Sequence, residues 1–197
     1  MKNPCPGLWL ADIQEQTKHL TSLTNNLITL SRMEEERTRL QMIDFPFSDV
    51  VEETVQSFQA LARTQNKTFE TLIQPMISLY GDEKSLTQLV SILLDNAMKY
   101  STPKGEISLR LEKAGNNVKL SVYNTADSIN REQLPPLFDR FYRTDKSRSS
   151  RTGGYGLGLS IAAAVVNTHK GKITATTQDE HSLLITVTLP LKAQGRK

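Results

Sequence analysis

Apolar residues recur every seven positions near the start of the chain, separated by polar residues such as Gln14 and Lys18. This spacing is typical of the seam of a coiled coil or helical bundle and predicts one long helix over residues 10–40. Such a helix depends on packing for its stability. Packing on the rest of this chain would suffice, but the narrow stripe and the helix length favour half of a dimerising bundle. The apolar positions of the repeat are Ile13, Leu20, Leu23, Leu27 and Leu30.

Three further helices and five strands are expected after this segment. Apolar spacing predicts helices at about 49–65, 82–100 and 156–168. Alternating apolar and polar residues predict strands in KTFETLIQ, ISLRLEKA, VKLSVYN, GKITATTQ and SLLITVTLPL. Gly115-Asn116-Asn117 is predicted to be a hairpin turn between the second and third of these strands.

Cap and turn residues predict where two of the helices begin. Pro46 interrupts the chain before the first of them, where Ser48 or Asp49 can serve as the N-cap. Gly81-Asp82 is predicted to turn the chain into the second helix.

The order of the elements indicates the fold class. Strands are followed by helices and by paired strands, not by regular strand–helix–strand repeats. This favours the α+β class, with an antiparallel or mixed sheet and helices on one face. No strand directly precedes the stretch GGYGLG, so it is not a dinucleotide-binding fingerprint. No Gly-Lys-Ser or Gly-Lys-Thr follows it, which excludes a Walker loop.

Length and composition exclude several classes of protein. A chain of 197 residues suits one domain plus an accessory element. It has no apolar run of membrane-spanning length, and its start, MKNPCPGLW, lacks a signal-peptide pattern. The single cysteine, Cys5, excludes an intramolecular disulfide framework and a zinc site built from thiols. Because the net charge of +3 is slight and the basic residues are scattered, no nucleic-acid partner is expected.

The stretch LVSILLDNAMKYSTPKGEISL carries the first candidate chemistry. Asn96, Lys99 and Tyr100 lie on a helix face next to the one that apolar residues bury. An asparagine inside an apolar helix is costly unless its amide is satisfied, and its carbonyl oxygen suits Mg²⁺ that shares phosphate oxygens. Lys99 could place a charge on a phosphate. Taken alone, these residues fit a capping or hydrogen-bonded asparagine and a solvated lysine better than a phosphate site.

The stretch RTGGYGLGLSIAAAVVNTHKG is the second candidate. Alternating glycines before a helix can expose backbone N–H groups to a phosphate, or can form an ordinary flexible turn. The preceding segment, YRTDKSRSSRTGG, is polar, basic and glycine-terminated, as an ordinary solvated loop would be.

Four motifs in order, LLDNAMKYS, SVYNTADSI, LFDRFYRTD and GGYGLGLSIA, resemble the N, G1, F and G2 boxes of bacterial sensor histidine kinases. The helix LTSLTNNLITLSRMEE resembles the second helix of that family's dimerisation hairpin. The resemblance implies a hairpin helix in residues 1–43, without its first helix, and an ATP-binding catalytic domain in 44–197. The implied fold is a two-layer α/β sandwich of the Bergerat type, preceded by a long N-terminal helix.

The resemblance also assigns roles to residues of this chain. Asn96 would bind Mg²⁺, while Lys99 and Tyr100 would contact phosphate and sugar. The segment YRTDKSRSSRTGG would be a mobile lid that becomes ordered over phosphate, and Phe138 and Phe141 would anchor it. The glycines would bring backbone N–H groups to the phosphates at a helix N-terminus, and Arg143 would approach the γ-phosphate. The residues expected to bind ATP are Asn96, Lys99, Tyr100, Asn124, Ile129, Phe138, Phe141, Gly154, Gly156, Leu157, Gly158 and Leu159.

Two departures from the family pattern bear on ATP. Asn124 stands where most members have an aspartate that accepts a hydrogen bond from the adenine amine, so this bond becomes a neutral and weaker one. Ala126 and Ser128 replace two glycines, which disfavours positive φ there. These changes leave a second hypothesis open: a degenerate domain that dimerises or docks a partner with little or no ATP binding.

The position four residues before Asn96 separates a kinase from a hydrolase. ATP-hydrolysing relatives of this fold use a glutamate there to activate water, whereas this chain has Ile92, which cannot act as a base. Slow spontaneous hydrolysis is therefore expected, which disfavours a third hypothesis, a free ATPase.

The histidines indicate what the chain lacks. The family's acceptor histidine precedes an acidic residue in a hairpin-helix motif, and none of His19, His169 and His181 has this context, so all three are expected to be ordinary surface residues. The chain is expected to be a fragment that binds ATP without autophosphorylating. The full-length protein would be a homodimer that phosphorylates a response regulator. This chain would be its cytoplasmic part, and any membrane attachment would come through absent upstream segments.

Overall fold

The structure of the protein is a computed structural model that describes residues 40–143 and 156–192, together with Thr17, Thr21 and Thr24. Those three threonines are helical, and the Thr21 hydroxyl donates a hydrogen bond to the Thr17 carbonyl at 2.9 Å. Leu40, the last residue of the helix predicted over residues 10–40, is not helical, and the rest of that prediction lies outside the described residues.

A five-stranded mixed sheet forms one layer, with the order β2-β4-β5-β7-β6. Only β2 and β4 pair in parallel, and the other neighbours are antiparallel. All five strands were predicted from alternation, and the mixed sheet is confirmed. The strands are β2 (Thr68–Ile73), β4 (Glu106–Ala114), β5 (Asn117–Thr125), β6 (Lys172–Thr176) and β7 (Ser182–Pro190).

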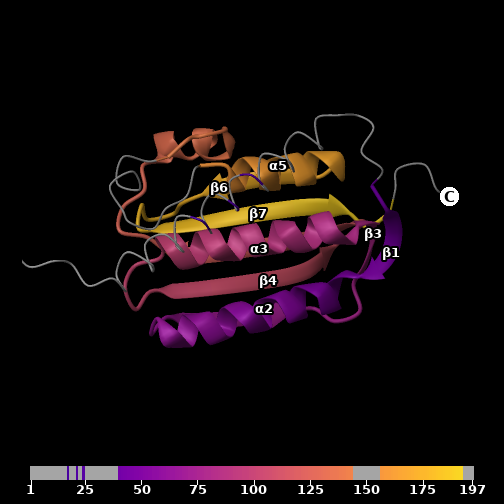
Figure 1. Ribbon diagram of the computed structural model, residues 1–197, viewed down its shortest axis with the longest axis horizontal. Coiled ribbons are helices and arrows are strands. Elements are labelled where there is room, and N and C mark those ends of the chain that lie inside the picture. Colours follow the sequence, from indigo (N-terminus) through magenta and orange to yellow (C-terminus); the bar gives the residue numbers. More distant parts are fainter. Residues whose placement is uncertain (1–16, 18–20, 22–23, 25–39, 144–155, 193–197) are drawn as a thin grey trace, which may run out of the picture.

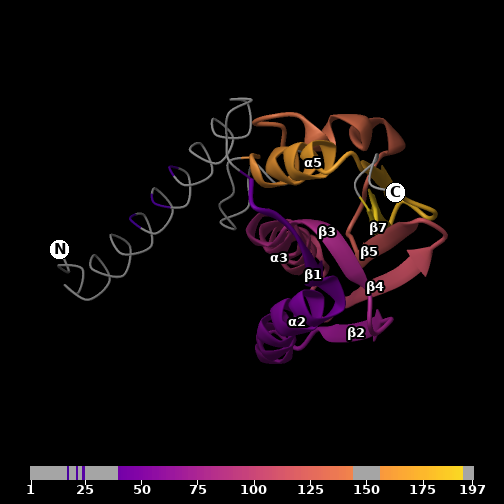
Figure 2. The same cartoon turned by 90° about the vertical axis from the view of Figure 1, so that its right-hand side faces the viewer.

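Helices α2 (Phe47–Thr64), α3 (Glu83–Tyr100) and α5 (Gly158–Thr168) form the second layer on one face of this sheet (Figures 1 and 2). This confirms the predicted α+β sandwich with helices on one face. Two short 3₁₀ helices, η1 (Arg131–Gln133) and η2 (Pro135–Phe138), follow β5, and η2 packs against α5.

A small antiparallel sheet of β1 (Met42–Pro46) and β3 (Ser78–Asp82) was not predicted. Each strand has five residues, too few for a clear period, and β1 ends in a proline. Pro46 is tolerated because it ends a strand at the edge of a sheet. The pair lies at one end of the domain, beside the start of α3 (Figure 1).

The core lies between the two layers. Alternate residues of β5, of β7 and of β4 up to Leu111 point toward the helices and are at most 4% exposed, which is the physical basis of the alternation in the sequence. From the helical layer, the largest fully buried side chains are Phe47, Leu86, Leu89, Leu93, Leu94 and Ile161.

The prediction that Ser48 or Asp49 caps the start of α2 is wrong. The helix begins at Phe47, and neither Ser48 nor Asp49 caps it. The Ser48 hydroxyl instead donates to the Gln74 carbonyl at 2.7 Å and accepts from the Ile77 N–H at 3.0 Å. These bonds tie α2 to the loop between β2 and β3, a long-range role that local sequence does not indicate.

The start of α3 also differs from the prediction. Gly81 lies inside β3 rather than in a turn, and Asp82 is the N-cap. The Asp82 carboxylate accepts from the Ser85 N–H at 2.8 Å and the Ser85 hydroxyl at 2.6 Å, as acidic N-caps commonly do.

Candidate functional site

Helix α3 positions three of the predicted residues near its C-terminal end. Its apolar side packs on the sheet, and Asn96 and Tyr100 are half-buried beside that side. Lys99 Nζ lies 2.6 Å from Asp95 Oδ2, and the two side chains are 36% and 51% exposed. An exposed pair of this kind contributes at most about 1 kcal/mol, so Lys99 can exchange its partner for a phosphate at small cost.

The start of α5 faces α3 one turn before Asn96. A Cβ on Gly158, the first residue of α5, would lie 3.5 Å from Ile92 Cγ2. The N-cap, Leu157, makes no side-chain cap hydrogen bond, and its carbonyl accepts from the Ile161 N–H at 3.0 Å. Among the described residues, no side chain therefore caps the first-turn N–H groups of this eleven-residue helix, which suits them to an anion.

Two backbone contacts join the ends of the predicted lid. The Phe141 N–H donates to the Gly156 carbonyl at 3.0 Å. Gly156 has φ +70°, and a Cβ there would lie 2.6 Å from the Tyr142 carbonyl oxygen, so this position requires glycine. Phe141 also has positive φ, at 62°, and its side chain is 63% exposed, whereas Phe138 packs against the core.

Part of the predicted lid lies outside the described residues. Gly154 and the basic cluster fall in 144–155, and Arg143 is the last described residue before this segment. Leu157 and Leu159, which follow Gly156, are buried against the core.

Asn124 lies at the end of β5 and is 2% exposed. Its Nδ2 donates to the Thr125 carbonyl at 2.8 Å, which leaves Oδ1 as the acceptor available to a ligand. The Thr125 hydroxyl lies 3.0 Å from that of Thr102, just after α3, so Asn124 and the C-terminal end of α3 lie at the same end of the domain. The N–H of Ile129, five residues further on, donates to the backbone carbonyl of Glu180 at 2.8 Å.

The described candidates thus gather around three elements that pack together: the second half of α3, the start of α5, and η2 with the residues after it. An Mg²⁺ ion fits these residues only if most of its ligands come from phosphate and water. The described residues contain no group of three acidic, histidine or cysteine side chains able to hold a metal. Asn96 would thus contribute one oxygen, with phosphate and water supplying the others, as is usual for Mg²⁺.

His169 is a residue whose environment the sequence analysis misjudged. It is 6% exposed rather than at the surface. Its Nδ1 lies 2.8 Å from the Val165 carbonyl, and its Nε2 accepts from the Asp82 N–H at 3.0 Å. Burial lowers the pKa of His169. The i, i+4 spacing from Val165 places it on the buried face of α5 and could have revealed this.

The other two histidines have separate outcomes. His181 is exposed as predicted, with its Nδ1 2.9 Å from the Asp127 carbonyl. His19 lies outside the described residues.

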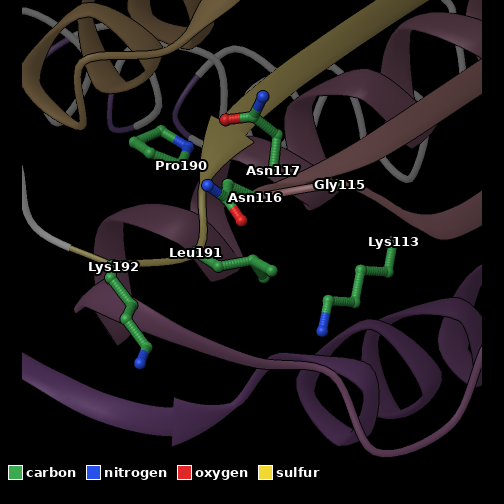
Figure 3. Close-up of a pocket in the computed structure, with 7 residues that line it drawn as sticks. All are labelled: Lys113, Gly115, Asn116, Asn117, Pro190, Leu191 and Lys192. Atoms are coloured by element: carbon green, nitrogen blue, oxygen red, sulfur yellow. The ribbon is translucent and has the colours of Figure 1, made fainter.

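A pocket of about 610 Å³ lies at the β4–β5 hairpin and the end of β7 (Figure 3). It is at the end of the sheet away from Asn124 and contains no predicted site residue. Its lining residues are Lys113, Gly115, Asn116, Asn117, Pro190, Leu191 and Lys192.

Comparison with known proteins identifies the family. The family described as "Histidine kinase-, DNA gyrase B-, and HSP90-like ATPase" matches residues 81–193. The chain is 32% identical over 192 residues to the sensor protein DltS of Streptococcus agalactiae serotype III (strain NEM316), covering 97% of this chain and 48% of DltS. The structure of Acinetobacter baumannii histidine kinase AdeS aligns with a TM-score of 0.78 and 25% identity, over 97% of this chain and 87% of AdeS.

A further structural likeness concerns the fold alone. The crystal structure of histidine kinase ThkA in complex with response regulator protein TrrA aligns with a TM-score of 0.77 and 21% identity, over 98% of this chain and 55% of that chain.

The chain therefore belongs to the histidine kinase-, DNA gyrase B- and HSP90-like ATPase family. Within it, the chain is a bacterial histidine kinase ATP-binding domain, which confirms the predicted resemblance. It spans about half the length of the curated relative DltS. Among the helices of the described residues, none is long and apolar enough to cross a membrane.

Proposed function

We propose that this chain binds ATP with Mg²⁺ and presents the γ-phosphate to a histidine on a helix outside the chain. The observation that carries the proposal is the start of α5, which lies against Ile92, one helical turn before Asn96, and whose N-cap residue makes no side-chain cap bond. A helix N-terminus attracts phosphate through its N–H groups and its dipole. Asn96 would supply the one protein oxygen to the metal.

The remaining candidates have distinct roles in this proposal. Asn124 Oδ1 accepts a hydrogen bond from the adenine amine, because Asn124 Nδ2 already donates to the Thr125 carbonyl. Lys99 leaves Asp95 and pairs with phosphate, while Tyr100 contacts the sugar. Arg143 approaches the γ-phosphate from the start of the segment at 144–155. Bound Mg²⁺ would neutralise phosphate charge as phosphoryl transfer proceeds.

The chemistry around Ile92 favours transfer to a protein over hydrolysis. Ile92 is half-buried and lies against Gly158, where its alkyl side chain can neither orient nor deprotonate water. The γ-phosphoryl group therefore persists until an acceptor histidine is placed in line with it. The catalytic contribution of the chain is positioning and electrostatic stabilisation.

The partners follow from the same proposal. Residues 1–43 would be the second helix of a dimerisation hairpin, and 44–197 the catalytic domain. The parent protein would be a homodimer on the cytoplasmic side of a membrane, attached through other segments. A response regulator would receive the phosphoryl group on an aspartate, as the partner TrrA in the ThkA complex suggests.

The test is a calorimetric titration of this chain with Mg²⁺ and a non-hydrolysable ATP analogue. Micromolar binding is expected, with a loss of at least tenfold in Asn96→Ala. Asn167→Ala is the matched control, because Asn167 is exposed at the opposite end of α5 from Gly158. Absence of binding to the folded wild-type chain at millimolar ligand would refute the proposal and leave the degenerate docking module.

A further inference from the structure

Three segments far apart in the sequence meet at Asp82, where β3 ends and α3 begins. Its carboxylate accepts from the Gln41 N–H at 3.0 Å and caps α3 through Ser85. Its own backbone N–H donates to His169 Nε2 at 3.0 Å. One residue, 8% exposed, therefore joins the chain entering β1, the helix that carries Asn96, and the C-terminal end of α5.

The ring of His169 is held at both of its nitrogens and at Cδ2. Because Nε2 accepts from Asp82, the neutral ring carries its proton on Nδ1 and donates it to the Val165 carbonyl. Gly81 closes the remaining space: a Cβ there would lie 2.9 Å from His169 Cδ2 and 2.7 Å from Leu86 Cδ1. Only glycine lets β3 approach the ring this closely, so the end of α5 has little freedom to slide against β3.

This contact has a consequence at the other end of α5. The helix has eleven residues and spans about 16 Å, short enough to move as a rigid rod. Its C-terminal end is fixed at Asp82, where α3 begins, and its first residue, Gly158, lies against Ile92 near the middle of α3. The two helices therefore run antiparallel, and the bond at one end of α5 sets where its first turn lies relative to Asn96.

We propose that Asp82 and His169 are positioning residues of the nucleotide site. The bond between the Asp82 N–H and His169 Nε2 holds the first turn of α5 at the distance from Asn96 that a shared phosphate requires. This inference rests on the proposed function, because it names the residues that set the geometry of that site without touching the ligand.

Two variants of His169 separate the bond from simple burial. In His169→Gln the side-chain oxygen reaches about as far as Nε2, so it keeps the acceptor for Asp82 and loses the donor to Val165. In His169→Asn the shorter side chain keeps a donor near the Nδ1 position and loses the acceptor. With Mg²⁺ and a non-hydrolysable ATP analogue, the dissociation constant should rise about tenfold in His169→Asn and stay within about twofold in His169→Gln.

Ser48→Ala is the control for stability. It removes the two hydrogen bonds that tie α2 to the loop between β2 and β3 and touches no residue of the proposed site, so the melting temperature should fall while the dissociation constant stays unchanged. If the two His169 variants weaken binding equally, in proportion to their loss of melting temperature, His169 has only a structural role and the proposal fails. Wild-type affinity in His169→Asn would also overturn it.

Amide hydrogen exchange distinguishes this proposal from the proposed function. If the wild-type chain binds no nucleotide, the proposed function fails, but the positioning bond can still be measured without ligand. The Ile161 amide, in the first turn of α5, should then exchange about tenfold faster in His169→Asn than in His169→Gln. Equal exchange in both variants would refute the positioning role.

Discussion

Lys67 closes the C-terminal end of α3, and removing its charge should destabilise the domain. Its Nζ donates to the Met98 carbonyl at 2.8 Å, the Ser101 carbonyl at 3.1 Å and the Ser101 hydroxyl. The last carbonyls of a helix lack partners within it, and a cation there also interacts favourably with the helix dipole. Met98 is 4% and Ser101 8% exposed, so water replaces these bonds poorly.

The Lys67→Met variant keeps most of the aliphatic stem and removes the ammonium group. A hydrogen bond from a charged group contributes about 1.5–3 kcal/mol, and the three bonds share one charge, so their contributions do not add. We expect the free energy of unfolding to fall by about 2 kcal/mol, which lowers the melting temperature by about 4–8 °C for a domain of this size.

The assay is urea unfolding followed by circular dichroism at pH 7.5, with Lys113→Met as the control because Lys113 is exposed on β4. The slope of free energy against urea should be unchanged and only the midpoint should move. If Lys67→Met is as stable as the control, the bonds at the end of α3 contribute nothing net and the reasoning is refuted.

Three further predictions concern titration, the adenine contact and hydrolysis. Burial lowers the pKa of His169 by more than the Val165 carbonyl and the Asp82 carboxylate raise it. The folded state therefore binds fewer protons than the unfolded state below about pH 6.5. Stability should therefore fall by up to about 1.4 kcal/mol per pH unit from pH 6.5 downward in urea titrations, and His169→Gln should lose this slope. Asn124→Asp brings an oxygen to the Thr125 carbonyl in place of the donor now 2.8 Å away, which should cost about 1–3 kcal/mol in the same assay; unchanged stability would contradict the assigned amide orientation. Ile92→Glu introduces a carboxylate beside Gly158 and should raise phosphate release from ATP at least tenfold, whereas an unchanged rate would show that the position cannot activate water.

The layer architecture could be predicted because its pattern is local. The five strands of the main sheet alternate between a buried and an exposed face, and each is long enough to show that period. By contrast, β1 and β3 have five residues each and are stabilised by pairing with each other across more than thirty positions. The start of α2 was misjudged for the same reason, because Ser48 bonds to Gln74 and Ile77 rather than to its own helix.

The candidate site could be predicted as far as its motifs are contiguous. Asn96, Lys99 and Tyr100 fall on one helix, so their spacing alone places them together. The sequence does not indicate that Lys99 pairs with Asp95, nor which way the Asn124 amide points, because both depend on side-chain geometry. The bond between Asp82 and His169 joins positions 87 residues apart and has no signature in either segment.

The polar groups at the ends of the two nucleotide-site helices are distributed unequally. Helix α3 is closed at both ends, by Asp82 at its start and by Lys67 at its C-terminal carbonyls. Helix α5 is held at its C-terminal end through His169, but no side chain of the part of the chain that the structure describes caps its start. A cap at that start would stabilise the chain by about 1 kcal/mol. Without one, its N–H groups are left for a ligand beside Ile92, one helical turn before Asn96. Of the four ends of α3 and α5, three are bonded to side chains of the described residues, and the fourth is the one to which the proposed function assigns a phosphate.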